Sequence, residues 1–532
     1  MTALRFPKRL SLGALPTDFQ EALRGLSANK LPADGSKPEK TIDVEVSFTA
    51  EHLGWVGSGD EEDVHRAVGA ARQAQRSWAH VPFSERKAIL LRFHDAVLKN
   101  HELLMDMVQL ETGKNRASAF DEVMDVANNS RYYANNAEKI LSPKRRRSAV
   151  PVLAKSRQHF QPVGVVGQIS PWNYPLTLGI SDALPALIAG NAVVAKPDSA
   201  TPFTSLLVFG LLFEAGLPRD LVQLVTGSGR VVGSEIANTC DFLMFTGSTA
   251  TGKILGATAG SRLIGFSAEL GGKNPLIVAA DAKMDYTVRG VVDACYSNSG
   301  QLCVSIERVY VERPVYEEFS TKFADAVRAM TLGPGFDWEV AMGSLASQQQ
   351  LDTVTSYVDD AVAKGARVLA GGKARPDLGP YFYEPTVLAD VPADAKLRTE
   401  EVFGPVVFVE VVDDLVAAVN AANDTVYGLN ASVFASPETG HRIAPQIRAG
   451  SVSINDGYTA AWSAIDNTSG GMKDSGMGGR HGAAGLLKYT DSQNITEQRW
   501  MSMRGPESLG AKAYARIMSS ALLAGKKLRM LP

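Results

Sequence analysis

Cysteine is scarce in this sequence of 532 residues, which contains only Cys240, Cys295 and Cys303. An odd and small number of thiols excludes a disulfide framework and fits a reducing compartment such as the cytoplasm. No two cysteines have the spacing of a metal-binding motif, and the eight histidines form no HxxxH cluster. Because zinc sites draw on such groupings, we expect no metal site.

Strong net charge and long apolar runs are also missing. The formal net charge of −3 argues against a nucleic-acid surface or a polybasic membrane anchor. The only dense basic block, residues 144–147, is expected to be a solvated connector. No stretch is long and apolar enough to span a bilayer, and the N-terminus lacks the apolar core of a secretory signal. With 45% hydrophobic and 21% charged residues, we expect a soluble protein of two or three domains.

The order of helix-like and strand-like segments predicts an α/β protein. Residues 1–40 are rich in proline, lysine and polar groups and are expected to form an arm or a loose lead-in. Helical spacing of apolar residues begins at Glu61, and after the basic block short runs such as GVVGQIS and NAVVAKP alternate with helical stretches. This alternation predicts a doubly wound parallel sheet with helices on both faces. A second α/β series from Gly271, with PLIVAA and RVYVE, predicts a separate catalytic domain.

Three residues have the chemistry and the context of a covalent catalyst. Cys303, in SGQLCVSIE, follows a glycine turn and could attack a carbonyl carbon as a thiolate, although a lone cysteine is more often buried filler. Glu269, in FSAELGG, has apolar neighbours that would raise its pKa toward that of a general base; the alternative is a paired structural carboxylate. Asn173, in SPWNYP, could donate to an oxyanion or serve a turn.

The order of the motifs is more specific than any one of them. The run GSTATG, residues 247–252, could bind a pyrophosphate at a helix N-terminus, but it is not the usual GxGxxG and is weak by itself. Between about Thr41 and Ser492 the sequence contains, in order, PWN, KP, FTGST, ELGGKNP, GQLC, EEVFGP, YGLNASVF and GGMKDSGMGGRHG. In this succession the chain resembles the aldehyde dehydrogenase superfamily.

The resemblance implies a role for each matching residue. Cys303 corresponds to the nucleophile, Glu269 to the general base, and Asn173, with the backbone N–H of Cys303, to the oxyanion hole. The thiolate would form a thiohemiacetal, hydride would leave to a nicotinamide, and water activated by Glu269 would hydrolyse the thioester. The positions expected to contact the dinucleotide are Trp172, Asn173, Lys196, Ser199, Gly247, Ser248, Leu270, Glu401 and Phe403.

The resemblance also implies a domain plan, which is a Rossmann-like cofactor domain, an α/β catalytic domain and a small strand arm for oligomerisation. We expect a homodimer or homotetramer in the cytoplasm, without a nucleic-acid partner or an integral membrane segment. The expected boundaries are 1–40 for the lead-in, 41–145 and 162–270 for the dinucleotide-binding domain, 271–487 for the catalytic domain, 146–161 and 488–500 for the arm, and 501–532 for a tail helix.

The cofactor and the substrate are expected from finer similarities. ISPWNYPLTL and SGQLCVSIERVYVE are most similar to NADP-dependent succinate-semialdehyde dehydrogenases of the second bacterial type. In members that favour NAD a glutamate commonly stands where this chain has Ser199, so NADP is the expected cofactor and NAD the alternative. Better-known relatives bind the substrate carboxylate with two arginines, at positions that are Ser181 and Ser297 here. Candidate replacements are Arg308 and Arg480, although both are expected to serve structure.

Other interpretations remain open at this point. The pocket could instead be an apolar tunnel for aromatic or medium-chain aldehydes, or the chain could be a non-catalytic member of the family. A member that passes its acyl group to coenzyme A would usually lack the general base, so Glu269 favours hydrolysis. The residues that would line the tunnel are Tyr174, Leu178, Tyr458 and Trp462.

The last residues, 511–532, predict an amphipathic helix with basic side chains. Such a helix could lie on a membrane surface or cover the mouth of a tunnel. We expect it to pack on its own subunit, because an apolar helix face is usually buried within the fold.

Overall fold

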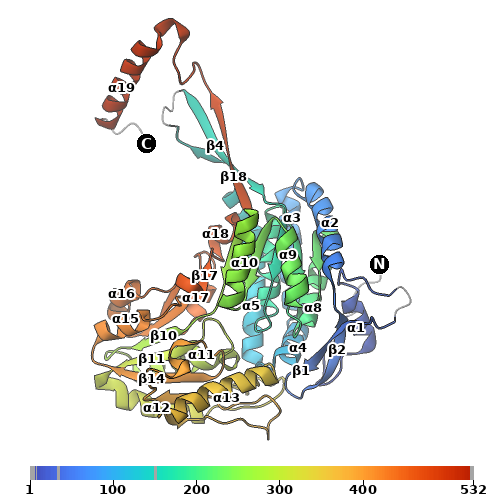
Figure 1. The fold of residues 1–532 in the computed structure, drawn as a ribbon, viewed down its shortest axis with the longest axis vertical. Helices are drawn as coiled ribbons and strands as arrows, with labels where there is room; N and C mark the ends of the chain where they lie inside the picture. The colour runs from blue at the N-terminus through green and yellow to red at the C-terminus, as the bar shows by residue number, and fades with distance from the viewer. Residues whose placement is uncertain (1–5, 8, 33–35, 149–152, 528–532) are drawn as a thin grey trace.

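The chain forms two α/β bodies and a narrow arm that projects from them (Figure 1). The computed structural model describes residues 6–7, 9–32, 36–148 and 153–527. The first body holds a six-stranded sheet and the second a seven-stranded sheet. This arrangement confirms the α/β fold class expected from the sequence.

The first sheet is parallel and reverses its strand order in the middle. Its order is β17-β9-β8-β5-β6-β7, and only β17 runs antiparallel to its neighbour. The chain lays down β5, β6 and β7 in one direction and then returns to place β8 and β9 on the other side of β5. Such a reversal opens a crevice at the carboxyl ends of the central strands. The strands are β5 (Val165–Ile169), β6 (Ala192–Lys196), β7 (Val222–Leu224), β8 (Phe242–Thr246), β9 (Gly265–Glu269) and β17 (Gly476–Met477).

Helices cover both faces of the first sheet. Every residue of β5, β6 and β8 is buried, and a parallel sheet reaches this state only with cover on both sides. One layer contains α2, α9 and α10, and another contains α7 with α3 and α5 packed against it. The helices of this body are α2 (Glu61–Trp78), α3 (Phe83–Lys99), α4 (His101–Thr112), α5 (Arg116–Leu141), α6 (Thr177–Ile180), α7 (Ala183–Ile188), α8 (Pro202–Glu214), α9 (Ser234–Thr239) and α10 (Thr249–Arg262).

The second sheet has the order β12-β13-β14-β11-β10-β15-β16 and is parallel except for β12. Side chains alternate between its faces, so Leu276 and Val278 pack with α11 and α12 while Ile277 packs with α15. The strands are β10 (Asn274–Val278), β11 (Ile306–Glu312), β12 (Arg367–Ala370), β13 (Thr386–Ala389), β14 (Val406–Val412), β15 (Asn430–Phe434) and β16 (Ser451–Ile454). The helices of this body are α11 (Met284–Tyr296), α12 (Tyr316–Arg328), α13 (Gln348–Ala363), α14 (Lys396–Thr399), α15 (Leu415–Asn423), α16 (Pro437–Ile443) and α17 (Thr459–Ser463). The next helix, α18 (Gly482–Leu487), packs against α5 and α7 of the first body.

The N-terminal segment is better packed than its composition indicates. It contains α1 (Thr17–Arg24), which precedes the hairpin of β1 (Thr41–Val46) and β2 (Glu51–Gly57). Phe19 and Leu23 are buried in the core of the first body, and the Asn29 side chain donates to the backbone carbonyl of Gly57 at 2.8 Å. The expectation of a loose lead-in is therefore wrong for this part of residues 1–40, because its few apolar side chains fill a gap in the first body.

Three strands form the projecting arm. They are β3 (Lys144–Arg146), β4 (Ala154–Pro162) and β18 (Thr490–Gln498), and β4 and β18 are antiparallel partners along their whole length. Beyond β18 the chain ends in α19 (Ala511–Lys527), which lies at the far end of the arm, away from both bodies (Figure 1). The expectation that this helix packs on its own subunit is wrong, because the arm holds it out of reach of the two cores.

Candidate active site

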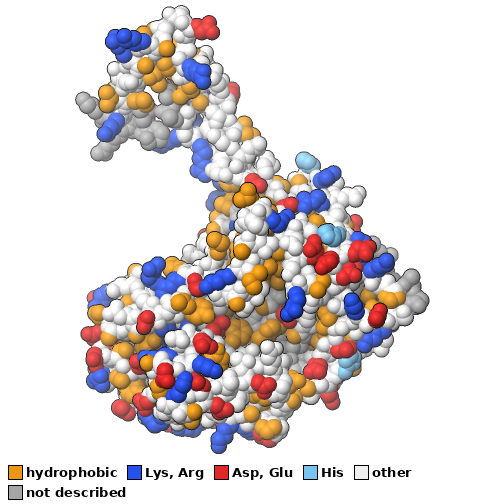
Figure 2. Space-filling model, in the orientation of Figure 1, with side chains coloured by type: hydrophobic (Ala, Val, Ile, Leu, Met, Phe, Trp, Pro, Cys, Tyr) orange, Lys and Arg blue, Asp and Glu red, His pale blue; other side chains and the backbone are white. Residues whose placement is uncertain are grey.

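The two bodies meet across a crevice at the carboxyl ends of the first sheet. Figure 2 shows the surface hollowed between them. The segment after β5 carries Asn173, β9 ends at Glu269, and the loop before β11 carries Cys303. All three residues line one pocket. The fold thus gathers the three candidate catalytic side chains, which are 130 positions apart in the sequence at their extremes.

Cys303 follows a turn that demands particular backbone conformations. Asn298 and Ser299 are left-handed, with φ of 51° and 55°, and both side chains donate to nearby backbone carbonyls that hold them there. Gly300 has φ of 71°, and a Cβ atom at this position would lie 2.1 Å from the carbonyl oxygen of Gly404. The glycine of the GQLC motif is therefore required by a close backbone approach.

The surroundings of Cys303 favour a neutral thiol. The side-chain amide of Asn274 donates to the carbonyls of Cys303 and Ser305, both at 2.7 Å, and so fixes the backbone on either side. Burial raises the pKa of the Cys303 thiol to about 12, and the positive charge of Arg480 only partly offsets this effect. Since the thiolate is the nucleophilic form, a base must accept its proton before attack.

Glu269 has the properties of that base. Burial raises the pKa of its carboxyl group to about 7, while the nearby cations Arg480 and Lys488 oppose the rise. Its Oε1 atom is buried and has no hydrogen-bond partner among the described residues. A carboxyl group that titrates near neutrality and keeps one oxygen free can both accept and release protons at physiological pH.

A buried charge network stands behind Glu269. Asp182 binds Arg480 at 2.6 Å and Lys488 at 3.3 Å, and these two cations hold the pKa of Asp182 below its usual range. Arg480 also donates to the hydroxyl of Thr246 at 2.6 Å. Although Arg480 lines the pocket, its guanidinium is therefore already paired with a carboxylate.

Arg308, the other candidate for a substrate carboxylate, lies elsewhere. It is buried between β11 and α15, where it donates to the carbonyls of Lys273, Ala421 and Ala422 at 2.8–3.1 Å. All of these acceptors are backbone groups, so Arg308 ties strands to a helix. The expectation that it serves structure agrees with this arrangement.

Asn173 lies beside the nucleophile loop. Its Nδ2 donates to the carbonyl of Gln301 at 3.1 Å, two residues before Cys303. Its own carbonyl accepts from Lys114 Nζ at 2.7 Å and from Asn298 Nδ2 at 3.1 Å. The backbone of Asn173 is thus held from two sides, and the side-chain amide is directed to the loop that carries the thiol.

Sequence reasoning missed a buried ion pair that supports this segment. Lys114 and Glu122 are fully buried, their charged atoms lie 2.6 Å apart, and Lys114 Nζ lies 3.8 Å from the centre of the Tyr174 ring. The other oxygen of Glu122 accepts from the backbone N–H groups of Leu176 and Thr177. The local sequence carries no signal for this pair, because only packing buries the two side chains beneath Tyr174.

The four residues proposed for an apolar tunnel come together beside the thiol. Tyr174, Leu178 and Tyr458 form one buried cluster with Leu302, and Trp462 packs against it. The ring of Trp462 lies 5.4 Å from that of Tyr174 and 5.8 Å from that of Tyr458. Since this cluster also touches the side chain of Cys303, an aldehyde that reaches the thiol must pass aromatic surfaces.

A carboxylate stands on the wall of the same pocket. Asp125, on α5, accepts from Trp462 Nε1 at 2.7 Å, from Ser181 Oγ at 2.8 Å and from Asn129 Nδ2 at 3.0 Å. These donors are neutral, and the imidazole of His481 is farther away at 3.9 Å. Ser181 thus lines the pocket but is bound to a carboxylate, whereas Ser297 donates back into its own helix.

The candidate cofactor residues lie along the strand ends of the first sheet. Lys196 ends β6, and its buried Nζ donates to the carbonyl of Pro197 at 2.6 Å but has no carboxylate ion-pair partner among the described residues. Ser199 donates to the carbonyl of Gly227 at 3.2 Å, while Asp198 accepts from the backbone N–H of Ala200 at 3.0 Å. A buried cation that lacks an anionic partner suits a bound polar or anionic group.

The remaining candidate cofactor residues lie around the same crevice. Ser248 caps the N-terminus of α10 directly after Gly247 and the end of β8, where the positive end of the helix dipole favours anions. The ring of Phe403 lies edge-on to that of Trp172 at 5.6 Å. Glu401 accepts from the backbone N–H of Gly272 at 2.8 Å, and burial raises its pKa to about 8. Leu270, after β9, packs against α10 at Gly252.

Comparison with known proteins decides the family. Residues 34–495 match the aldehyde dehydrogenase family. The chain belongs to this family. A protein of Mycolicibacterium smegmatis, provisionally named succinate-semialdehyde dehydrogenase [NADP(+)], is 50% identical over 512 residues, which cover 96% of this chain and 98% of that protein. A relative from Mycobacterium tuberculosis H37Rv with a similar provisional name is 51% identical, and the matched region covers 93% of this chain and 95% of that protein.

Solved structures of other aldehyde dehydrogenases have the same fold. Betaine aldehyde dehydrogenase of Staphylococcus aureus, determined with NAD+, superposes with a TM-score of 0.83 at 34% identity and covers 91% of this chain and 98% of its own. An E. coli NADP-dependent enzyme gives 0.83 at 32% identity, with 89% and 99% covered. At such identity the comparison extends beyond the fold to family membership.

The described part of this aldehyde dehydrogenase offers no further cofactor signal. In residues 6–7, 9–32, 36–148 and 153–527, no cluster of three or more histidine, cysteine, aspartate or glutamate side chains could hold a metal ion. Within the same ranges, no helix has the length and apolar character needed to cross a membrane.

Proposed function

We propose that this aldehyde dehydrogenase oxidises an aldehyde to a carboxylic acid with NADP+, using Cys303 as nucleophile, Glu269 as base and Asn173 as oxyanion donor. The observation that carries the proposal is that these three residues line one pocket. There the carboxyl group of Glu269 has a pKa raised to about 7, and one of its oxygens has no hydrogen-bond partner among the described residues. Formation of NADPH from NADP+ and an aldehyde tests it. Absence of NADPH with every aldehyde would favour a non-catalytic member of the family.

Each step assigns a task to a residue of the chain. Glu269 accepts the thiol proton of Cys303, and the thiolate attacks the carbonyl carbon to form a thiohemiacetal. Asn173 Nδ2 and the backbone N–H of Cys303 stabilise the oxyanion. Bound NADP+ supplies the acceptor for the hydride that leaves the former carbonyl carbon. Glu269 releases that first proton to solvent and then takes a proton from water, which attacks the thioester. Collapse of the adduct releases the acid and the thiolate of Cys303, which regains its proton from Glu269. Hydrolysis by this carboxylate favours the acid over a coenzyme A thioester.

The cofactor residues fit NADP+ by the chemistry of their donors. Lys196 contributes a buried cation, Ser199 a hydroxyl, and the N-terminus of α10 a positive field for phosphate. The carboxylate of Asp198, which would repel a phosphate, accepts a hydrogen bond from the backbone N–H of Ala200. The remaining residues proposed to contact the dinucleotide are Trp172, Asn173, Gly247, Ser248, Leu270, Glu401 and Phe403.

Replacing Ser199 with glutamate should turn the preference from NADP toward NAD. A glutamate here would face the 2′-phosphate with a like charge, a repulsion on the scale of about 1–4 kcal/mol in a partly exposed site. We therefore expect kcat/KM for NADP to fall roughly tenfold or more, with a small change for NAD. Ser199→Ala is the matched control, since it removes the hydroxyl without adding charge. A wild type that already favours NAD, or an unchanged ratio in Ser199→Glu, would show that Ser199 does not set the choice.

The proposed substrate is succinate semialdehyde, supported by the provisional names of the relatives at about 50% identity. The pocket itself favours a second candidate, a neutral aromatic or medium-chain aldehyde. Its walls are aromatic, its carboxylate Asp125 has neutral donors, and its arginine Arg480 is paired with Asp182. The two candidates differ in the charge at the far end of the substrate.

A pair of aldehydes that have the same chain length but differ in charge separates the candidates. The quantity to compare is the ratio of kcat/KM for succinate semialdehyde to kcat/KM for butanal. We expect this ratio to be roughly tenfold to a hundredfold lower than in relatives that have the arginine pair, because a hydrogen bond to a charged group contributes about 1.5–3 kcal/mol. NADPH absorbance measures both rates. An overwhelming preference for succinate semialdehyde would contradict the expected weak binding of the substrate carboxylate and would mean that another cation binds it. A preference for butanal would support the neutral candidate.

Assembly and location are proposed on separate grounds. The exposed β4–β18 arm supports a homodimer or homotetramer, because an isolated ribbon of this length gains stability from a second surface. The three cysteines are free, as expected for a cytoplasmic enzyme. Light scattering of the purified protein gives the subunit number.

A further inference from the structure

The C-terminal helix α19 has two arcs of opposite chemistry. With 3.6 residues per turn, residues three and four apart share an arc. One arc is apolar and consists of Tyr514, Ile517, Met518, Ala521 and Leu522. The other arc carries the cations Lys512, Arg516 and Lys526, with Leu523 as its apolar exception. The helix is thus amphipathic, and its polar side is basic.

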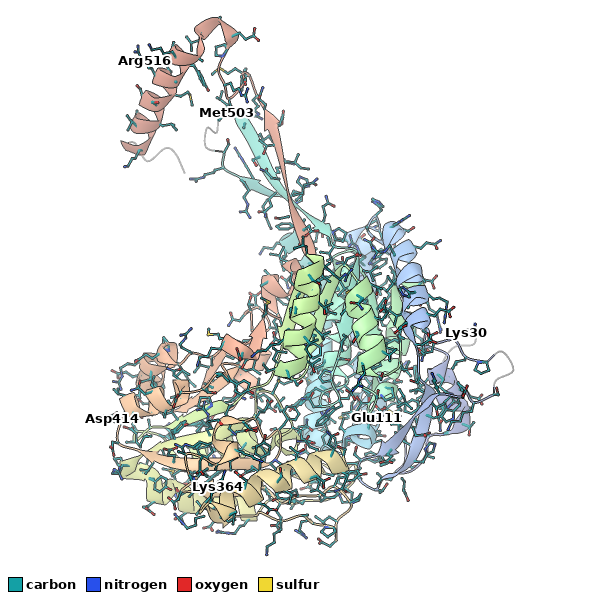
Figure 3. All side chains as sticks on the ribbon, in the orientation of Figure 1. Lys30, Glu111, Lys364, Asp414, Met503 and Arg516 are labelled. Carbon is teal, nitrogen blue, oxygen red and sulfur yellow. The ribbon has the colours of Figure 1, made fainter. Side chains whose placement is uncertain are left out.

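The apolar arc is not covered by either body. Ile517 is 53% exposed and Leu522 is 46% exposed. The segment that leads to the helix is equally open, since Trp500 is 90% exposed and Met503 is 43% exposed. Figure 3 shows Met503 and Arg516 together at the end of the arm, far from the crevice. Tyr514 donates its hydroxyl to the carbonyl of Met503 at 2.8 Å, which ties the helix to this segment.

Charge is segregated toward this end of the molecule. No acidic residue follows Glu507, whereas five lysines and arginines follow it. The basic block of residues 144–147 belongs to the same arm, because β3 pairs with β4 there. A chain with a net charge of −3 therefore carries a cationic arm and tail. The overall net charge of −3 therefore does not exclude a membrane-binding surface at this end of the molecule.

We propose that α19 binds the surface of an anionic lipid bilayer, with its apolar arc in the interface and its cations near the headgroups. A basic amphipathic helix with aromatic residues beside it suits that environment. At 17 residues with several charges, α19 does not meet the requirements for spanning a bilayer. Docking on a second copy would use the apolar arc but would not require every charge on the opposite arc to be positive. This interaction is independent of the aldehyde chemistry.

Vesicle sedimentation of the full-length enzyme tests the proposal. Vesicles of phosphatidylcholine with phosphatidylglycerol should carry the protein into the pellet, and vesicles of phosphatidylcholine alone should carry much less. Binding should weaken in 1 M salt, where the Debye length is about 3 Å. NADPH formation with a short aldehyde, measured on the same samples, should be the same for every variant below. Equal binding to both vesicle types, or none to either, would overturn the proposal.

Neighbouring leucines provide a matched pair of variants. Leu522→Ser removes an apolar side chain from the apolar arc and should weaken vesicle binding roughly tenfold or more. Leu523→Ser makes the same change on the basic arc and should leave binding close to that of the wild type. The double variant Lys512→Glu/Arg516→Glu should weaken binding to anionic vesicles roughly a hundredfold. If Leu522→Ser instead alters the subunit number and leaves vesicle binding unchanged, a second copy covers the helix and the proposal is wrong.

Discussion

Cys303→Ala is expected to lower NADPH formation by about 10⁴-fold or more, because without the thiol no thiohemiacetal can form and hydride transfer has no starting point. The loss should appear in kcat with little change in cofactor binding, since Cys303 lies on the substrate side of the crevice with Leu302 and Tyr458. Steady-state absorbance gives the rate, and fluorescence titration gives the affinity for NADPH. Substantial turnover by the variant would mean that another group attacks the aldehyde.

The other two cysteines provide the control. Cys240 is buried in the first body and Cys295 in the second, and burial raises the pKa of both thiols. Replacing either with alanine should reduce stability somewhat but leave kcat close to that of the wild type. A thiol reagent should therefore inactivate wild type and Cys295→Ala at similar rates. If Cys295→Ala resisted the reagent, modification of Cys303 would not be the cause of inactivation.

Local sequence patterns were enough to single out the three candidate catalytic residues, because each of them lies close to a turn. Glu269 ends a strand, while Asn173 and Cys303 lie in loops within four residues of one, where glycine, proline or a change of periodicity marks the chain. The strand and helix alternation likewise predicted both sheets, because a buried parallel strand is a short continuous apolar run. These features depend on neighbours in sequence, so they can be read without the fold.

Features that depend on distant partners could not be predicted in this way. Lys114, in the loop between α4 and α5, and Glu122, on α5, look like surface residues in the sequence, and only packing makes them a buried ion pair beneath Tyr174. Asp125 becomes a pocket carboxylate only because α17 brings Trp462 to it from 337 positions away. Helical periodicity predicted α19, but nothing in its sequence indicates that the arm holds it away from the bodies.

Glu269→Gln is expected to separate the two halves of the reaction. The amide cannot accept a proton from water, so hydrolysis of the thioester should slow by about 10²–10⁴-fold, the usual range for a general base. Acylation should be less affected, because the thiol of Cys303 can also lose its proton to solvent at high pH. Rapid mixing should show a burst of NADPH of about one equivalent per active site, followed by a slow steady state. A variant with no burst would place the main role of Glu269 in thiol activation, and full steady-state activity would exclude it as the base.

The pH profile supplies an independent test of the same residue. The carboxyl group of Glu269 acts as a base only when ionised, and its pKa is raised to about 7, so wild-type kcat should rise with pH through that value and then level off. In Glu269→Gln this inflection should disappear, because the titrating group is gone. Arg480 opposes the rise in the Glu269 pKa, so replacing it with the neutral residue glutamine should move the inflection to higher pH. A wild-type profile that is flat between pH 6 and 8, or an inflection that persists in Glu269→Gln, would assign that ionisation to another group.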